Sequence, residues 1–242
     1  MRVALISDLH GNEAALDAVL ADAARAGADR VVCLGDVATL GPRPREVLAR
    51  LRALGCECIL GNHDEFLFNA PLIHSYSEAQ VIVDAVDWCR AQLSADELAF
   101  VRSFKSESSI ALDGGATLLL FHGSPRSHME DLLATTPPDE LDRFLDGRAA
   151  TVMAGGHTHV QMARQHRGML LVNPGSVGLP FKEYVAGKTP TLMGHAEYAL
   201  VESQNGAVGV NLRRVAVDGR AHRASLEHWD SPLRAMLMQQ YV

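Results

Sequence analysis

The chain of 242 residues has few aromatic residues, few cysteines and no excess of positive charge. No stretch approaches the roughly 18 consecutive apolar residues of a membrane-spanning helix, and the apolar start of the chain is too short for a secretion signal. The four cysteines form no C-x-x-C pair, so we expect free thiols in a reducing cytoplasm. Lys and Arg number 22 against 29 Asp and Glu, which argues against nucleic acid as a partner. The sequence thus predicts a cytoplasmic protein with no membrane partner.

The overall composition is that of an ordinary folded protein, with 48% hydrophobic and 21% charged residues. The length suits one domain, and no internal repeat indicates a solenoid. We therefore expect a single domain over residues 1–242. Apolar residues at helical spacing between about 66 and 106 predict a helical insertion that lies over the functional site.

The first sixty residues alternate between strand and helix patterns. Strands are expected at 2–6, 30–34 and 56–60, and helices at 13–26 and 44–54. This βαβαβ order implies parallel strands with right-handed crossovers, and a ligand crevice beyond their carboxyl ends. Further strands are expected at 110–112, 116–121, 151–154, 169–172, 198–202 and 208–217, with helices at 77–92, from 94 through 101, at 139–145 and over the last twenty residues.

Clusters of histidine, aspartate and asparagine follow the predicted strands. The candidate metal ligands in these clusters are Asp8, His10, Asp36, Asn62, His122, His157 and His159. One strand–loop–helix unit of 24 residues separates His10 from Gly35, and another of 24 residues separates Asp36 from Gly61. We therefore expect these loops to return to the same edge of the sheet.

The ligand types and their number indicate two ions. Oxygen ligands mixed with imidazoles suit Mn, Fe, Zn or a similar divalent ion. Seven ligands are too many for one ion, whereas two ions about 3.5–4 Å apart with one bridging carboxylate would use them all. Because side chains at i and i+2 of an extended segment share a face, Asp8 and His10 are expected to serve one ion, and His157 and His159 to divide between two.

These motifs together resemble a known family. D-x-H, G-D, G-N-H-D, an isolated H-G and G-H-T-H, with the segment NPGSVG at 173–178, are similar to the calcineurin-like metallophosphoesterase superfamily, especially its small single-domain bacterial and archaeal members. The resemblance implies an α/β fold of two mixed sheets packed face to face with helices outside.

The resemblance also implies roles for the residues. Asp8, His10 and His159 would hold one ion, Asn62, His122 and His157 would hold the second, and Asp36 would bridge them. His63 would protonate the leaving-group oxygen without binding metal. Manganese is the ion that we expect first, with Fe, Zn, Ni, Co or Mg as alternatives.

The activity that follows is hydrolysis of a phosphodiester, nucleotide or phosphomonoester, by a hydroxide shared between the ions and with His63 as proton donor. The alternatives are a dinucleoside polyphosphate hydrolase, a nuclease, a phosphoprotein phosphatase and a non-catalytic metal-binding scaffold. Thr39 and Leu40 stand where protein phosphatases carry an acidic residue and a phosphate-gripping arginine, which weakens the phosphatase hypothesis.

Substrate contacts are harder to assign. Asn12, at the start of the first predicted helix, offers an amide to the phosphate or only caps that helix. Arg43, Arg126 and Lys182 are cations in loops near the motifs. The expected partner is a small phosphate ester or nucleotide. The sequence leaves open which residue orients His63, although Asp64 is the neighbour of His63 in the chain. Formation of a homo-oligomer is also left open.

Overall fold

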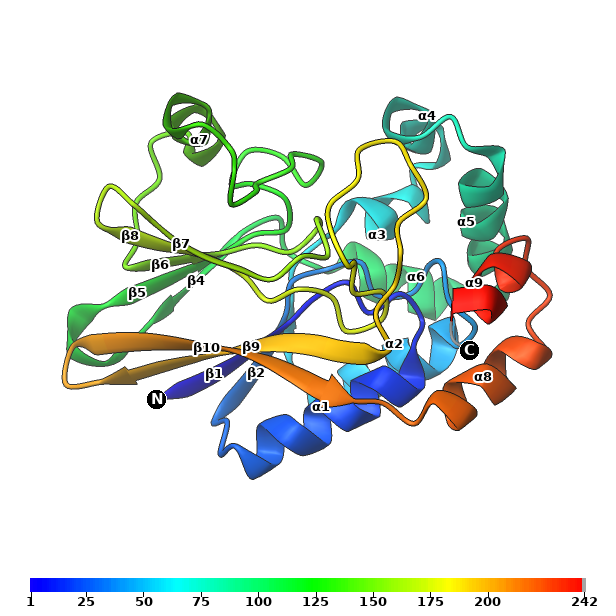
Figure 1. Cartoon of the computed structure of the whole chain (residues 1–242), viewed down its shortest axis with the longest axis horizontal. Helices are drawn as coiled ribbons and strands as arrows, with labels where there is room; N and C mark the ends of the chain where they lie inside the picture. Colours follow the sequence, from blue (N-terminus) through cyan, green and yellow to red (C-terminus); the bar gives the residue numbers. More distant parts are fainter. Residues whose placement is uncertain (241–242) are drawn as a thin grey trace.

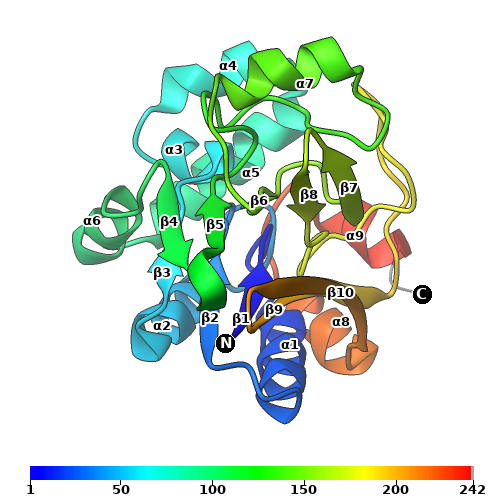
Figure 2. The same ribbon diagram turned by 90° about the vertical axis from the view of Figure 1, so that its left-hand side faces the viewer.

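Two mixed five-stranded sheets form the centre of the molecule in a computed structural model that describes residues 1–240 (Figures 1 and 2). The first sheet has the order β10-β9-β1-β2-β3 and the second β4-β5-β6-β8-β7. The strands of the first sheet are β1 (Arg2–Ile6), β2 (Arg30–Cys33), β3 (Glu57–Cys58), β9 (His195–Gln204) and β10 (Ala207–Ala216). Those of the second are β4 (Ser108–Ala111), β5 (Thr117–Leu120), β6 (Val152–Ala154), β7 (Met162–His166) and β8 (Met169–Asn173).

Alternation along the central strand β1 divides its side chains between two cores. Val3 and Leu5 lie between the sheets, where they pack in one cluster with side chains such as Leu118 of the second sheet. Ala4 and Ile6 face the helices that cover the first sheet. Strand β1 pairs in parallel with β2, and β2 pairs in parallel with β3. The carboxyl ends of these three strands therefore meet at one edge.

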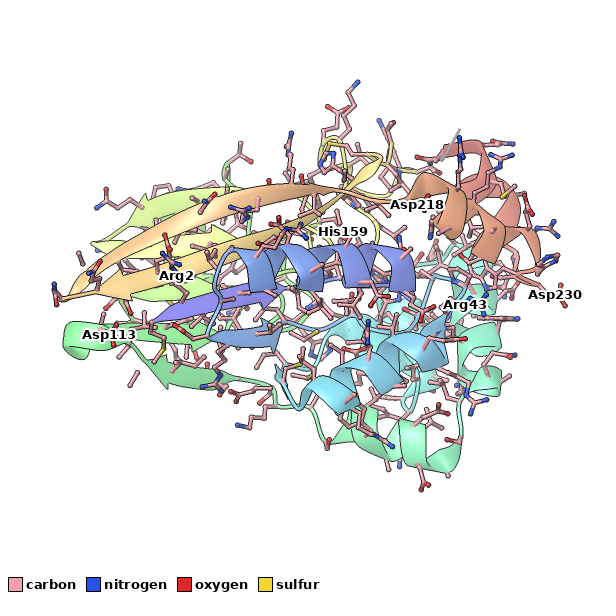
Figure 3. All side chains as sticks on the ribbon, turned by 90° about the horizontal axis from the view of Figure 1, so that it is seen from below. Arg2, Arg43, Asp113, His159, Asp218 and Asp230 are labelled. Atoms are coloured by element: carbon pink, nitrogen blue, oxygen red, sulfur yellow. The ribbon has the colours of Figure 1, made fainter. Side chains whose placement is uncertain are left out.

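Helices α1 (Glu13–Arg25) and α2 (Pro44–Leu54) cover the outer face of the first sheet, and Figure 3 shows them from that side. Their apolar stripes, which include Leu16 and Leu48, are buried against the strands. The Asn12 side chain caps α1 by accepting a hydrogen bond from the backbone N–H of Ala15. Gly55 ends α2 with a positive φ of 61°.

The segment between β3 and β4 is helical. It contains α3 (Asn62–Phe66), the 3₁₀ turn η1 (Ala70–Leu72), α4 (Ile73–Tyr76), α5 (Gln80–Gln92) and α6 (Ala95–Arg102). A second 3₁₀ turn, η2 (Asp113–Gly115), joins β4 to β5, and α7 (Pro138–Leu145) packs on the outer face of the second sheet. The chain continues after β10 into α8 (Gly219–Glu227) and α9 (Arg234–Gln240). Trp229, which follows α8, packs edge-on against Trp88 of α5 at 5.7 Å between ring centroids. No helix among the described residues is long and apolar enough to cross a membrane.

The expected α/β fold of two facing mixed sheets is confirmed, with three differences in detail. Strand β7 was not predicted, because its sequence MARQH carries polar residues at most positions. The Asn62 segment begins helix α3 rather than lying in a loop. The expected single terminal helix is two helices, since the segment between them contains Pro232, which disfavours a continuous helix. Of that predicted segment, residues 241–242 lie outside the described part of the chain.

Candidate metal centre

The seven predicted ligands meet where loops from both sheets converge. Asp8 and His10 follow β1, Asp36 follows β2, and Asn62 is the first residue of α3 after β3. The second sheet contributes His122 after β5, and His157 and His159 after β6. All seven residues are buried, with an exposed fraction of 6% or less. The site is therefore built by loops of both sheets that cover one another.

Five of these residues have a left-handed backbone. The φ values are 54° for Asp8, 44° for His10, 57° for Asp36, 71° for His157 and 58° for His159. Such conformations cost a non-glycine residue of order 1–3 kcal/mol and concentrate at functional sites. The expectation that extended backbone places Asp8 and His10 on one face was wrong in its geometry. Sharp turns bring the two side chains together instead.

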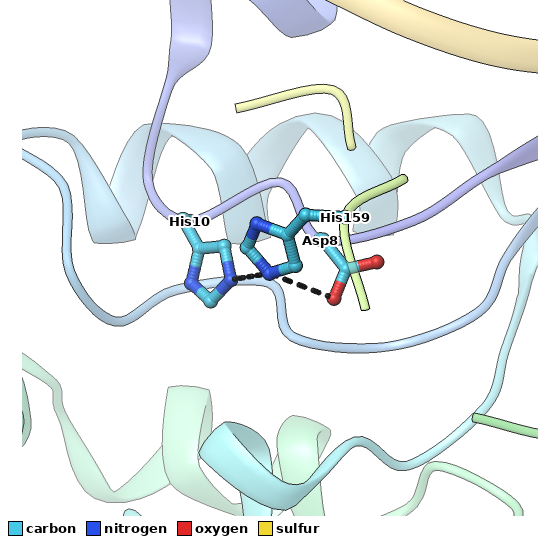
Figure 4. Close-up of side chains that lie close together, drawn as sticks. All are labelled: Asp8, His10 and His159. Carbon is cyan, nitrogen blue, oxygen red and sulfur yellow. Dashed lines mark hydrogen bonds and ion pairs between the residues drawn. The ribbon is translucent and has the colours of Figure 1, made fainter. Parts of the chain in front are cut away.

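The first group of potential ligands consists of Asp8, His10 and His159, whose donor atoms lie within 4.8 Å of one another (Figure 4). The Nε2 atoms of the two histidines are 3.1 Å apart, and Nε2 of His159 is 3.4 Å from Oδ1 of Asp8. Nδ1 of His10 faces the carbonyl oxygen of Thr39 at 3.2 Å, and Nδ1 of His159 faces that of Leu179 at 2.7 Å. Each Nδ1 therefore carries the ring proton, which leaves two Nε2 lone pairs facing each other.

The second group consists of Asp36, His122 and His157, with Asn62 between the two rings. Oδ1 of Asn62 is 3.1 Å from Nε2 of His122 and 3.0 Å from Nδ1 of His157. Oδ2 of Asp36 lies 3.4 Å from Nε2 of His122 and 3.9 Å from Nε2 of His10 in the first group. Asp36 is thus placed between the two groups, where a bridging carboxylate would lie.

The donor set fits two cations. Facing lone pairs of acceptor atoms repel one another unless a positive charge lies between them, and buried Oδ1 of Asp8 has no hydrogen-bond partner among the described residues. The pKa directions agree with this reading. Burial and the neighbouring His159 lower the pKa of His10 to about 3. Burial also opposes the charge on His122, but Asp36 and Asp8 outweigh it and raise that pKa to about 9. The carboxylates therefore draw positive charge into the site.

The segment NPGSVG braces the loops that carry the ligands. The Ser176 hydroxyl and the Gly178 backbone N–H both donate to the carbonyl oxygen of Asp8, at 2.7 and 3.0 Å. The Asn173 amide donates to the carbonyl oxygen of Gly156, at 2.6 Å. This segment therefore holds the Asp8 loop and the His157 loop together.

Asp64 has a different structural role from orienting His63. Its carboxylate accepts hydrogen bonds from the backbone N–H groups of Asp36, Val37 and Gly61, at 2.8, 2.9 and 3.0 Å. Burial and the nearby charge of Asp36 raise its pKa to about 6. Asp64 thus fixes the backbone of the bridging residue and does not point at the His63 ring.

His63 lies beside both groups without belonging to either. Its ring packs edge-on against His10 at 5.3 Å and against Tyr76 at 5.7 Å between centroids. Its backbone N–H donates to Oδ1 of Asp36 at 2.9 Å, and its Nδ1 has no hydrogen-bond partner in the described part of the chain. Burial, reinforced by neighbouring imidazoles, lowers its pKa to about 4. The ring is therefore held beside the two groups by aromatic packing.

The residues expected to contact substrate are less clearly placed. Both ends of the Asn12 amide are engaged, one by Ala15 and the other by donation to the carbonyl oxygen of Gly178 at 3.1 Å. Arg43 pairs with Glu46 at 3.2 Å and Arg126 with Glu130 at 2.7 Å, while Lys182 is exposed. Figure 3 shows Arg43 on the outside, near the start of α2. Their contact with substrate stays a prediction.

Three residues near the centre were not predicted. Tyr76 of α4 lies 5.7 Å from His63 and 5.8 Å from His157 between ring centroids. Asp131 lies 3.4 Å from Nε2 of His157 and accepts a hydrogen bond from Tyr184 at 2.5 Å. Nothing in the spacing of these residues distinguishes them, because their approach depends on the paths of long loops.

The fold and the two ligand groups define an α/β protein with a candidate metal centre at the edge of two facing sheets. The chain belongs to the calcineurin-like phosphoesterase superfamily, whose domain model matches residues 1–205. This family normally uses divalent metals. The predicted resemblance is thereby confirmed.

Individual relatives agree with this assignment. The chain is 30% identical over 195 residues to the uncharacterized protein MJ0912 of Methanocaldococcus jannaschii. This alignment covers 74% of this chain and 76% of the relative. It resembles the crystal structure of a metallophosphoesterase from Sphaerobacter thermophilus with a TM-score of 0.75, 26% identity and full coverage of both chains. The hypothetical protein PH1004 from Pyrococcus horikoshii has the same fold, with a TM-score of 0.78, 19% identity and coverage of 98% of this chain and 97% of its own.

Proposed function

We propose that this protein is a phosphoesterase that binds two divalent metal ions, manganese first among them, and hydrolyses a small phosphodiester, nucleotide or phosphomonoester. The observation that carries the proposal is the pair of buried ligand groups with Asp36 between them. His63 lies directly beside this pair. When bound, two such ions neutralise the phosphate oxygens and lower the pKa of a water molecule between them.

His63 supplies the proton for the leaving group in this proposal. In the free protein the ring is neutral near pH 7, since burial lowers its pKa to about 4. The negative charge of a phosphate ester favours the protonated ring, because an opposite charge nearby raises the pKa of a histidine. The substrate would thus help to charge its own proton donor.

Two features favour a small ester over a phosphoprotein. Leu40, at the position of the missing arginine, packs against the apolar cluster that includes Leu179 and Trp229. No cation stands there to grip a phosphopeptide. The net charge of −7 likewise disfavours a nuclease that binds a polyanionic chain.

A dinucleoside polyphosphate stays within the proposed substrate class, whereas a non-catalytic scaffold would not need His63. The four free cysteines suit a reducing cytoplasm.

The proposal is tested with an activity panel on the purified protein, supplemented in turn with Mn, Fe, Zn, Ni, Co and Mg. The substrates are p-nitrophenyl phosphate, its bis ester, cyclic nucleotides, dinucleoside polyphosphates and a phosphopeptide. We expect metal-dependent turnover of small esters and none of the phosphopeptide. A protein that binds metal but turns over no substrate with any metal would support the scaffold alternative instead.

Replacing His63 by alanine separates metal binding from proton transfer. The His63→Ala variant should keep its bound metal, because the ring is not in either ligand group, and should lose about 10²–10⁴-fold in turnover. The measurement is metal content alongside steady-state kinetics on the best substrate of the panel. His74→Ala, an exposed histidine of α4, is the control and should keep wild-type rates. Wild-type turnover in His63→Ala would remove His63 from the mechanism.

A further inference from the structure

One of the four histidines of the metal centre is oriented differently from the others. His10, His122 and His159 each turn one ring nitrogen to a backbone carbonyl oxygen, at 3.2, 2.6 and 2.7 Å. The ring of His157 has no such carbonyl partner in the part of the chain that the structure describes. Its Nδ1 faces Oδ1 of Asn62 at 3.0 Å, and its Nε2 faces Oδ1 of Asp131 at 3.4 Å.

The carboxylate of Asp131 is itself held in place by another loop. Its Oδ2 accepts a hydrogen bond of 2.5 Å from the hydroxyl of Tyr184. Tyr184 belongs to the segment between β8 and β9, which runs past the site as the yellow loop of Figure 1. The side chain of Asp131 is 42% exposed, so without Tyr184 it would be free to turn into solvent. A chain of contacts therefore leads from this loop to a metal-site histidine.

The position of the single ring proton on neutral His157 decides which of its two ring nitrogens has a lone pair for a metal ion. If the proton is on Nδ1, it is donated to Asn62 and Nδ1 has no lone pair for an ion. If it is on Nε2, it faces Asp131 and the Nδ1 lone pair is directed into the second group. A carboxylate is a stronger hydrogen-bond acceptor than an amide oxygen, so Asp131 favours the second arrangement.

We propose that Asp131, held by Tyr184, is a positioning residue that keeps the Nδ1 lone pair of His157 directed at the second metal ion. The inference rests on the two-ion centre of the proposed function and adds residues from outside the family motifs. Outer partners of this kind typically change metal affinity by 10–100-fold. The other three histidines need no such partner, because backbone carbonyls fix their tautomers.

The experiment is a titration of the metal-free full chain with Mn²⁺, in which isothermal titration calorimetry measures the binding of each ion. Wild type should bind two ions. Asp131→Ala should bind one ion as wild type does and the other 10–100-fold more weakly. Asp131→Asn, which keeps an acceptor but loses the charge, and Tyr184→Phe, which loses only the hydroxyl, should lie between these two. Asp139→Ala replaces an exposed aspartate of the neighbouring α7 and should bind both ions as wild type does.

Two further measurements distinguish positioning from a general loss of structure. In a His157→Ala background, Asp131→Ala should cause no further loss of affinity, because its effect passes through the ring. In the metal-free protein, the ¹⁵N spectrum of His157 should change from the Nε2–H to the Nδ1–H tautomer in Asp131→Ala.

Wild-type affinity for both ions in Asp131→Ala, or an additive loss in the double variant, would overturn the positioning role and leave the proposed hydrolysis intact. A wild-type protein that binds fewer than two ions would overturn both. Two ions bound in wild type, with the expected loss in Asp131→Ala but no turnover, would overturn only the hydrolysis.

Discussion

At the scale of single residues, the centre depends on backbone positions that only glycine can fill. Gly61 approaches the bridging ligand so closely that a Cβ atom there would lie 2.1 Å from Oδ1 of Asp36 and 2.6 Å from its backbone nitrogen. Neither atom can move freely, since Asp36 has a left-handed φ of 57° and its N–H is bonded to Asp64. This close approach lets the carboxylate of Asp36, which follows β2, accept a hydrogen bond from the backbone of His63, which follows β3.

Gly61→Ala should therefore reduce metal binding at both groups together. The added methyl group must displace Asp36, which lies between the two groups, and overpacking of this kind costs about 1–3 kcal/mol. Metal content and the urea unfolding curve are the measurements. Gly209→Ala in β10, where a Cβ would meet nothing within 4 Å, is the control. A Gly61→Ala protein with two tightly bound ions would contradict the expectation.

At the scale of elements, the carboxyl-terminal helices support the segment beside the site. Trp229 and Leu237 share an apolar cluster with Ala85 of α5 and with Leu179, whose carbonyl oxygen faces His159. Helix α8 also buries His222, with an exposed fraction of 2%. The helices thus stabilise the Leu179 segment, and one of them carries a titratable group in its packed face.

Burial of His222 predicts an acid-sensitive contribution to stability. Burial lowers its pKa from 6.5 to about 4, so the unfolded state binds this proton more readily than the folded state. The contribution is present above pH 6.5, falls as the pH drops towards 4, and amounts to at most about 3 kcal/mol. Urea unfolding at pH 7.5, 6, 5 and 4 should show a steeper acid loss in wild type than in His222→Leu. The same substitution at the exposed His228 should keep the wild-type slope, and identical slopes in all three proteins would refute the prediction.

At the scale of the whole molecule, the candidate metal centre draws its residues from both sheets. Asp8, His10 and Asp36 come from loops of the first sheet and Asn62 from the start of α3 beyond it, and the three other candidate histidine ligands come from loops of the second sheet. Buried hydrogen bonds also connect these loops, such as those to Asp8 from the backbone N–H of His157 at 3.1 Å and from the Ser176 hydroxyl at 2.7 Å, and a cation held by ligands of both sheets would add to them. Bound cations would therefore stabilise the packing of one sheet on the other.

Metal removal should consequently lower the stability of the entire chain. Free Mn²⁺ at about 100 times its dissociation constant adds about 2.7 kcal/mol per site, or roughly 5–10 °C in the melting temperature of a chain of this length. Differential scanning calorimetry of chelated and Mn-loaded protein measures the change. Asp36→Asn should lose most of the gain, whereas Asp139→Asn should keep it. A melting temperature independent of Mn²⁺ at millimolar concentration would rule out this linkage.

The local sequence was sufficient for most elements and for the ligand set. Short apolar runs located β1 and β2, because these strands are buried between two cores, and period-3.6 patterns located α1 and α2, because each helix buries one face; all four agree to within a residue or two. Strand β7 escaped because it lies at the edge of the second sheet, where burial imposes little pattern. The seven candidate ligands could be predicted because polar residues directly after buried strands have few structural reasons to be there.

The sequence by itself determined the family, the two-sheet fold and the identity of the potential ligands, because these depend on local patterns and on motifs a few residues long. Only the tertiary structure decided how those residues face one another and that five of them have a left-handed backbone. It also decided that Asp64 accepts a hydrogen bond from the backbone of Asp36 and does not orient the His63 ring. The same is true of Asp131, which approaches His157, and of Tyr184, which holds Asp131 from a separate loop. Such contacts form between residues distant in the chain, and their geometry is set by the packing of the sheets that carry the loops.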